Sequence, residues 1–287
     1  MLHHMKKILT IAMAAAIVCS CNFQIPQGLI DFINSFSSEQ TEGIVAGGGT
    51  GTSIQESGFM ELPAIEADDV ILSHKAYTIS YNADARIPEW VAYELTADEV
   101  NGDADRDESV FQMDPQYRKT QAMREDYSGS GWTRGHMACA ADFRWDDEAM
   151  DETFYLTNIC PQDEELNAGD WNYLEKQVRW WARDFGRVWV VSGPIIGSCK
   201  YGTIGDRDVV VPDAFFKAVL TESKGKYRSI AFVMGNDDER YYLADCSMTV
   251  NDLEKITGID FFPALPDDLE DDVESQLKFK DWGIKAR

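Results

Sequence analysis

Residues 131–137 read Gly-Trp-Thr-Arg-Gly-His-Met and place an arginine and a histidine two positions apart in a chain with few imidazoles. The 287 residues include 4 histidines. His3 and His4 lie in a segment that the sequence predicts to be a leader, so His74 and His136 are the candidates for chemistry in the mature protein. A reaction that needs an imidazole as base or as metal ligand must use one of these two side chains.

Apolar patterns around this segment predict both strands and helices. Residues 90–96 alternate as a strand does, and further strands are predicted at the β-rich apolar runs 154–159, 188–192, 209–211, 215–220, 229–234 and 241–250. Apolar residues at spacings of three and four predict an amphipathic helix over 169–185, and a shorter helix is predicted over 250–257. We therefore expect an α+β fold with a mainly antiparallel sheet core.

Polar residues of catalytic type follow the histidine in a definite order. Arg134 and His136 lie on a strand or loop, Asn158 on a strand, Asn167 in a turn and Glu175 on the helix. A phosphodiester hydrolase needs a base to activate water, a divalent cation, and a positive side chain for the charge of the transition state. His136, a metal held by Asn167, and Arg134 would supply these three parts.

Each of these residues also has an ordinary structural role when it is taken alone. A single histidine more often has a structural role, as a helix cap or as part of the packing, than a catalytic one. Asn167 is a suitable cap for the helix that follows it. Glu175 could pair with Arg179 one helical turn later. Capping and metal binding by Asn167 are compatible if its side-chain oxygen faces a cleft.

Three motifs together resemble the DNA/RNA non-specific endonuclease family, the ββα-metal nucleases. They are Thr-Arg-Gly-His at 133–136, Asn-Ile-Cys-Pro-Gln at 158–162, and Leu-Asn-x-Gly-x-Trp-x-x-Leu-Glu at 166–175. Further similarity extends over residues 70 to 275, nearly the whole predicted domain. The resemblance implies a ββα-metal active-site motif within the α+β fold.

The resemblance also implies a role for each matching residue. His136 corresponds to the general base and Asn167 to the direct ligand of a magnesium ion that keeps most of its waters, a position that Mn²⁺ or another divalent ion can take. Glu175 corresponds to a carboxylate that acts on the metal through water, Arg134 to an arginine near the phosphate, and Asn158 to a residue that orients the histidine. The family implies cleavage of DNA and RNA with little sequence preference, leaving 5'-phosphate ends.

Two positions depart from the family pattern. Thr133 stands where an aspartate is usual, so the task of that carboxylate must be done differently, and a hydroxyl acceptor is what threonine offers. Ser109 aligns with an upstream arginine of some members. We expect a phosphate clamp that is weaker, or one built from Arg106 or Arg118.

Composition leaves a second class of function open. The formal charge of -24 describes an acidic surface that repels polyanions at long range, although five basic residues surround the histidine segment: Arg118, Lys119, Arg124, Arg134 and Arg144. The charge and Thr133 favour a catalytically inactive binding or scaffold protein on the same fold, whereas the combined set of candidate residues favours an enzyme. A phosphodiesterase for small nucleotides is a third alternative, and the sequence does not indicate the oligomeric state.

The N-terminal segment predicts export. Two lysines precede an apolar run at residues 8–18, which is too short to span a bilayer and is typical of a secretory signal. Residues 1–21 are predicted to be a signal peptide of the lipoprotein type, with Cys21 as the lipidated first mature residue. Ordinary cleavage and secretion stays open as an alternative. We expect a periplasmic or outer-membrane lipoprotein, or a secreted protein.

The rest of the chain divides into a linker and one domain. Residues 22–65 lack sustained apolar periodicity and include a glycine-rich stretch at 47–53, so they are predicted to be a flexible linker. Residues 66–287 show no comparable break and form the predicted domain. Its four cysteines have no Cys-x-x-Cys spacing; we expect two buried thiols and one disulfide, between Cys199 and Cys246, with the pairing open to alternatives.

Overall fold

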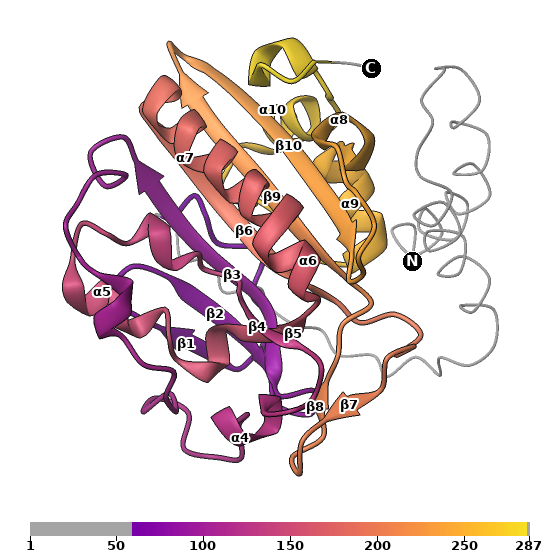
Figure 1. The fold of residues 1–287 in the computed structure, drawn as a ribbon. Helices are drawn as coiled ribbons and strands as arrows, with labels where there is room; N and C mark the ends of the chain where they lie inside the picture. The colour runs from indigo at the N-terminus through magenta and orange to yellow at the C-terminus, as the bar shows by residue number, and fades with distance from the viewer. Residues whose placement is uncertain (1–58, 286–287) are drawn as a thin grey trace.

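The computed structural model describes residues 59–285 (Figure 1). The predicted signal peptide, with Cys21, and linker residues 22–58 lie outside the described residues. Among the helices of residues 59–285, none is both long and apolar enough to cross a bilayer.

A seven-stranded sheet forms the centre of the domain, with strand order β1-β2-β3-β6-β9-β10-β11 and every neighbouring pair antiparallel. The strands are β1 (Ile71–Ser73), β2 (Thr78–Asn82), β3 (Ile87–Thr96), β6 (Arg187–Ile195), β9 (Ala214–Ser223), β10 (Lys226–Gly235) and β11 (Ser247–Met248). Two small hairpins stand apart from it: β4 (Thr133–His136) with β5 (Ile159–Gln162), and β7 (Thr203–Ile204) with β8 (Val209–Val210). The expected α+β class with a mainly antiparallel sheet is confirmed.

Helices cover both faces of this sheet, and the loops carry several short turns. The helices are α4 (Arg124–Tyr127), α5 (Asp147–Glu152), α6 (Glu164–Leu166), α7 (Asn172–Phe185), α8 (Leu243–Cys246), α9 (Val250–Thr257) and α10 (Asp267–Glu274). The short turns are η1 (Arg106–Glu108), η2 (Ala140–Asp142), η3 (Leu156–Asn158), the π turn η4 (Asn167–Trp171) and η5 (Phe279–Trp282).

Both faces of the sheet are buried, because alternate residues of each strand enter different cores. Val190 and Val219 lie in the core beneath α7, whereas their chain neighbours Val191 and Ala218 lie in the core beneath α9 and α10. Figure 1 shows α7 lying along one face of the sheet, over β6 and β9. This packing holds α7 rigidly, so its N-terminal end is a fixed platform for side chains.

Two predicted strands require correction. In 154–159, residues Leu156–Asn158 form η3 and the strand begins at Ile159, because the side chain of Asn158 bonds to the backbone of Ala138 and Thr153. In 241–250, residues Leu243–Cys246 form α8. The backbone N–H of Tyr241 bonds to Asp170, which directs the chain away from the sheet.

The folded domain begins before the predicted boundary at residue 66. Met60, Leu62 and Ile65 pack against the core beneath α9 and α10. The backbone N–H of Ala64 also donates to the carbonyl of Asp260 at 2.9 Å. This part of the predicted linker therefore belongs to the domain.

The predicted disulfide is absent. All four cysteines of the described chain are free: Cys139, Cys160, Cys199 and Cys246. Cys246 is buried in α8, where its thiol donates to the carbonyl of Leu243, while Cys199 lies exposed in a loop. Residues Leu243–Cys246 form α8, so Cys246 does not lie on the strand that was predicted over 241–250.

Candidate active site

A cleft of about 420 Å³ opens between the β4–β5 hairpin and the N-terminal end of α7. Four of the five candidate residues line it, namely Arg134, His136, Asn167 and Glu175. Its other lining residues are Arg106, Phe111, Thr133, Cys139, Ala140, Ala141, Glu164, Ala168 and Asn172. The structure thus brings together residues that are separated by up to about forty positions in the sequence.

The β4–β5 hairpin sets the direction of Arg134 and His136. Side chains two apart on a strand point to the same side, so both face the cleft. Between them, Gly135 pairs with Cys160, and a Cβ at position 135 would come within 2.1 Å of Oε1 of Gln162. Glycine is therefore required here for the two strands to pair.

His136 is held between two aromatic rings. Its ring centroid lies 4.9 Å from that of Phe154, in a T-shaped contact, and 5.4 Å from that of Phe111. Nε2 is buried and has no hydrogen-bond partner within the described structure. Burial, followed by the charges of Arg106 and Arg134, lowers the pKa of His136 to about 3. The imidazole is therefore neutral at pH 7, with a free ring nitrogen that can accept a proton.

The low pKa of His136 should be visible in the pH dependence of its ring. In the metal-free protein, the ¹H NMR signal of the His136 ring should not titrate between pH 5 and 8, because the protonated form is disfavoured until about pH 3. Since the ordinary pKa of histidine is 6.5, the unfolded chain binds a proton first, and this contribution to stability is lost as the pH falls from 6.5 towards 3. An Arg106→Gln variant should move the pKa back upward. A wild-type midpoint near 6.5 would contradict the account.

Two arginines provide the positive charge of the cleft. The guanidinium carbon of Arg134 lies 4.4 Å from the ring centroid of Phe111, which fixes the side chain by a cation–π contact. Arg106, from η1, also lines the cleft, whereas Ser109 points away and bonds to Asp151 at 2.5 Å. Of the two arginines that the sequence offered as replacements, Arg106 reaches the cleft and Arg118 is not among its lining residues.

Thr133 orients Asn167. The hydroxyl of Thr133 donates to the carbonyl of Gln162 at 2.7 Å, and its oxygen accepts the amide N–H of Asn167 at 3.0 Å. Because the amide nitrogen is engaged, the Oδ1 atom of Asn167 is the atom available to an ion.

Glu175 borders a buried polar network beneath the cleft. The thiol of Cys139 bonds to its carboxylate, and burial raises the pKa of Glu175 while the charge of Lys217 opposes that increase. Lys217 is completely buried; its Nζ donates to Oγ of Ser192 at 3.1 Å and lies 4.8 Å from the ring centroid of Trp171. Lys217 is not among the candidate residues of the sequence, although a lysine within the apolar run 215–220 is a visible signal.

Two expected contacts are different in the structure. Asn158 is completely buried and bonds to backbone groups at Ala138 and Thr153, so it fixes the chain that follows the histidine and does not contact the imidazole through its side chain. Arg179 pairs with Asp142 at 2.6 Å, on η2, instead of with Glu175. Both residues therefore stabilise the site from outside the cleft.

The donor set fits a hydrated divalent ion. Within residues 59–285, no group of three His, Cys, Asp or Glu side chains is placed to form a metal cage. The cleft instead offers the amide oxygen of Asn167 and the carboxylate of Glu175, both hard oxygen donors. Mg²⁺ dehydrates reluctantly and is commonly held by one or two protein oxygens with several waters.

The sequence of the domain matches a known protein family. A family model described as DNA/RNA non-specific endonuclease matches residues 59–268. The chain belongs to this family.

Named relatives and one solved structure agree with this assignment. The chain is 40% identical over 207 residues to the mitochondrial nuclease EXOG of Xenopus laevis, covering 67% of this chain and 58% of the relative. It is 36% identical over 204 residues to the mitochondrial endonuclease G of Homo sapiens, covering 67% of this chain and 69% of the relative. The solved EndoG/EndoGI complex matches with a TM-score of 0.66 and 32% identity over 74% of this chain and 91% of that one. The chain thus spans less than two thirds of the EXOG relative.

These relatives correct the predicted location. The EXOG and endonuclease G proteins are named as mitochondrial, which contradicts the expected periplasmic, outer-membrane or secreted location. A basic, apolar N-terminal segment does not by itself identify a compartment, because transit peptides are also basic and amphipathic.

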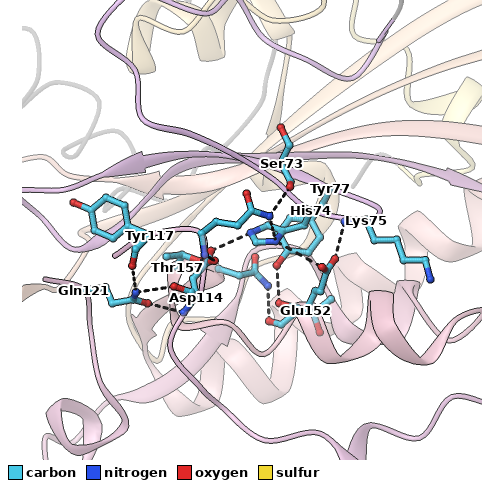
Figure 2. Close-up of polar contacts among 12 residues, drawn as sticks. Ser73, His74, Lys75, Tyr77, Asp114, Tyr117, Gln121, Glu152 and Thr157 are labelled. Atoms are coloured by element: carbon cyan, nitrogen blue, oxygen red, sulfur yellow. Dashed lines mark hydrogen bonds and ion pairs between the residues drawn. The ribbon is translucent and has the colours of Figure 1, made fainter. Parts of the chain in front are cut away.

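The second imidazole, His74, belongs to a separate buried network (Figure 2). Nε2 of His74 lies 3.0 Å from the carboxylate of Asp114, and both side chains are fully buried. Thr157 donates to the same carboxylate at 2.6 Å. Burial raises the pKa of Asp114, but the hydrogen bonds from His74 and Thr157 outweigh it, so that the pKa lies below its ordinary value. His74, the other candidate imidazole of the sequence, therefore belongs to this buried network and does not line the cleft.

Replacing His74 by alanine should reduce the free energy of unfolding by about 2 kcal/mol, because the buried carboxylate of Asp114 loses a hydrogen-bond donor. Chemical denaturation of the two proteins measures this. The matched variant Asp114→Asn keeps a hydrogen-bonding side chain without the charge and should be destabilised less. Equal stability of His74→Ala and the wild type would show that the network contributes nothing to the fold.

Proposed function

We propose that this protein is a divalent-metal-dependent endonuclease that hydrolyses the phosphodiester bonds of DNA and RNA with little sequence preference. The observation that carries the proposal is the convergence of a neutral, unpartnered imidazole, two arginines and an amide oxygen in one cleft. Family membership supports the same activity. The two arginines line the cleft together with Glu164 and Glu175, on a chain whose net charge is -24.

The residues of the cleft divide the chemistry among them. Nε2 of His136 takes a proton from the attacking water, whose oxygen forms a bond to phosphorus while the bond from phosphorus to the 3'-oxygen breaks. Arg134 and Arg106 face the phosphate and offset the charge that develops on its oxygens. Asn167 would hold Mg²⁺ directly and Glu175 would hold it through water; the ion, when bound, stabilises the negative charge on the leaving oxygen. Mn²⁺ or another divalent ion would serve the same purpose.

Cleavage of circular DNA tests this proposal. With Mg²⁺, the purified protein should convert supercoiled plasmid to nicked and linear forms and should also degrade RNA, and EDTA should abolish both reactions. Plasmid cleavage requires an internal cut, so it separates an endonuclease from an enzyme that acts on ends. Binding of DNA without cleavage at any divalent ion would instead support an inactive binding protein. Turnover of dinucleotides without plasmid cleavage would support a phosphodiesterase for small nucleotides.

A further inference from the structure

The outer side of α7 carries aromatic and basic side chains in one row. Tyr173 and Trp180 are 51% and 50% exposed, and Lys176 and Arg183 are also exposed. Positions three, seven and ten residues apart lie along one side of an α-helix. These four residues, called here the α7 outer face, therefore form a continuous stripe on the side of α7 opposite to its buried residues.

The charge of the α7 outer face differs from that of the chain as a whole. Neither Lys176 nor Arg183 pairs with a carboxylate anywhere in residues 59–285. Two cations without a carboxylate partner among the described residues thus lie beside two exposed rings, on a protein with a net charge of -24. This combination complements a polyanion that also presents flat apolar surfaces.

The α7 outer face is continuous with the cleft. Asn172, the first residue of α7, lines the cleft, and Tyr173 follows it directly. Trp180 is two helical turns further on, roughly 10 Å along the axis. A stacked strand advances about 3.4 Å per nucleotide, so the two rings are about three nucleotides apart on a strand that leaves the cleft along the helix.

We propose that the α7 outer face binds a single-stranded stretch of nucleic acid that leads into the cleft, with bases stacked on Tyr173 and Trp180 and phosphates near Lys176 and Arg183. Aromatic rings bind unpaired bases of any type by stacking, whereas a duplex hides those base faces in its own stack. This inference rests on the proposed function and adds a preference for unpaired substrate. The preference requires no base-specific contact, in agreement with low sequence specificity.

Binding of oligonucleotides in EDTA tests the inference without hydrolysis. Fluorescence anisotropy with a labelled 20-nucleotide oligo-dT should show a Kd about tenfold or more higher for Tyr173→Ala/Trp180→Ala than for the wild type, and a smaller increase for a 20-base-pair duplex. Tyr173→Phe/Trp180→Phe retains both rings and should bind as the wild type does. Phe59→Ala removes a ring of similar exposure, 57%, beside Met60 on the other side of the sheet, and should have no effect.

Salt dependence tests the two cations separately. Lys176→Gln/Arg183→Gln should reduce the slope of log Kd against log salt by about 0.7 for each phosphate that is no longer neutralised. The inference is wrong if the double alanine variant binds oligo-dT with the wild-type Kd, or if the Kd values for single strand and duplex rise equally. It is also wrong if sedimentation shows a dimer that the alanine variant loses while oligonucleotide binding is unchanged.

The inference and the proposed function fail in different ways. If the wild type does not cleave DNA with Mg²⁺ but the α7 variants lose affinity for oligo-dT, the proposed function is wrong and the inference about the α7 outer face is supported. If the wild type cleaves plasmid and the variants retain wild-type affinity, the inference about the α7 outer face is wrong while the proposed function is supported.

Discussion

In a His136→Ala variant, we expect kcat/KM for DNA cleavage with Mg²⁺ to fall by about 10²–10⁴-fold, the usual contribution of a positioned general base. The reason is that His136 lines the cleft as a neutral imidazole whose Nε2 has no hydrogen-bond partner among the described residues. The side chain is packed between Phe111 and Phe154 and is not part of a polar network, so its removal should affect the rate much more than the fold. Initial rates of plasmid nicking measure the effect.

The matched control is the other imidazole of the described chain. His74→Ala, measured well below its melting temperature, should keep kcat/KM within a few-fold of the wild type, because His74 lies in the separate Asp114 network. If His136→Ala cleaved DNA at the wild-type rate, His136 would not be the general base. Equal losses in the two variants would show that the His136 effect arises from instability.

In an Asn167→Ala variant, activity should fall by more than about 100-fold at a Mg²⁺ concentration that saturates the wild type. Losses of 10- to 100-fold are usual when a residue that only supports a metal ligand is removed, and Asn167 is the proposed ligand itself. The decrease should be partly overcome by a higher concentration of Mg²⁺ or Mn²⁺, since the waters and Glu175 remain. Rates measured as a function of metal concentration separate a loss of metal affinity from a loss of kcat.

Two further variants give this prediction its controls. Asn172→Ala removes an amide from the same cleft that bonds to the carbonyl of Ala168, so activity should change less than tenfold. Thr133→Val keeps the shape of the side chain but loses the hydroxyl that holds Asn167, and should cost about 10- to 100-fold. If Asn167→Ala and the wild type respond identically to metal, Asn167 is not the ligand.

Four of the five candidate residues from the sequence line one cleft because the motifs fix local structure. Arg134 and His136 are two apart on a strand and therefore share a side wherever the strand lies. Asn167 lies just before α7 and Glu175 at its start, so the same short segment carries both. The alternation of apolar residues likewise predicted the long strands and the helix that positions Glu175. Residues 154–159 and 241–250 were assigned wrongly because side-chain bonds to distant backbone override local propensity there.

Other features depend on contacts that a single sequence does not reveal. Thr133 can hold Asn167 only because β4 pairs with β5, and the sequence alone does not show this pairing. Arg106 lines the cleft because a long loop brings it there, and the course of that loop could not be predicted. Lys217 lies within an apolar strand, and only the sheet shows that it points towards Trp171 and the Glu175 network. The disulfide prediction was wrong because Cys246 is buried in α8 while Cys199 lies exposed in a loop, and no local pattern in the sequence shows this.

The most direct measurement is a crystal structure of the protein grown or soaked with Mn²⁺, with the ion located by its anomalous signal. The account predicts one ion in the cleft, about 2.0–2.2 Å from Oδ1 of Asn167, with water in most other positions and Glu175 reaching it through one of those waters. An ion bound elsewhere with the cleft empty, or direct coordination by His136, would contradict the assignment of His136 as the base and Asn167 as the metal ligand.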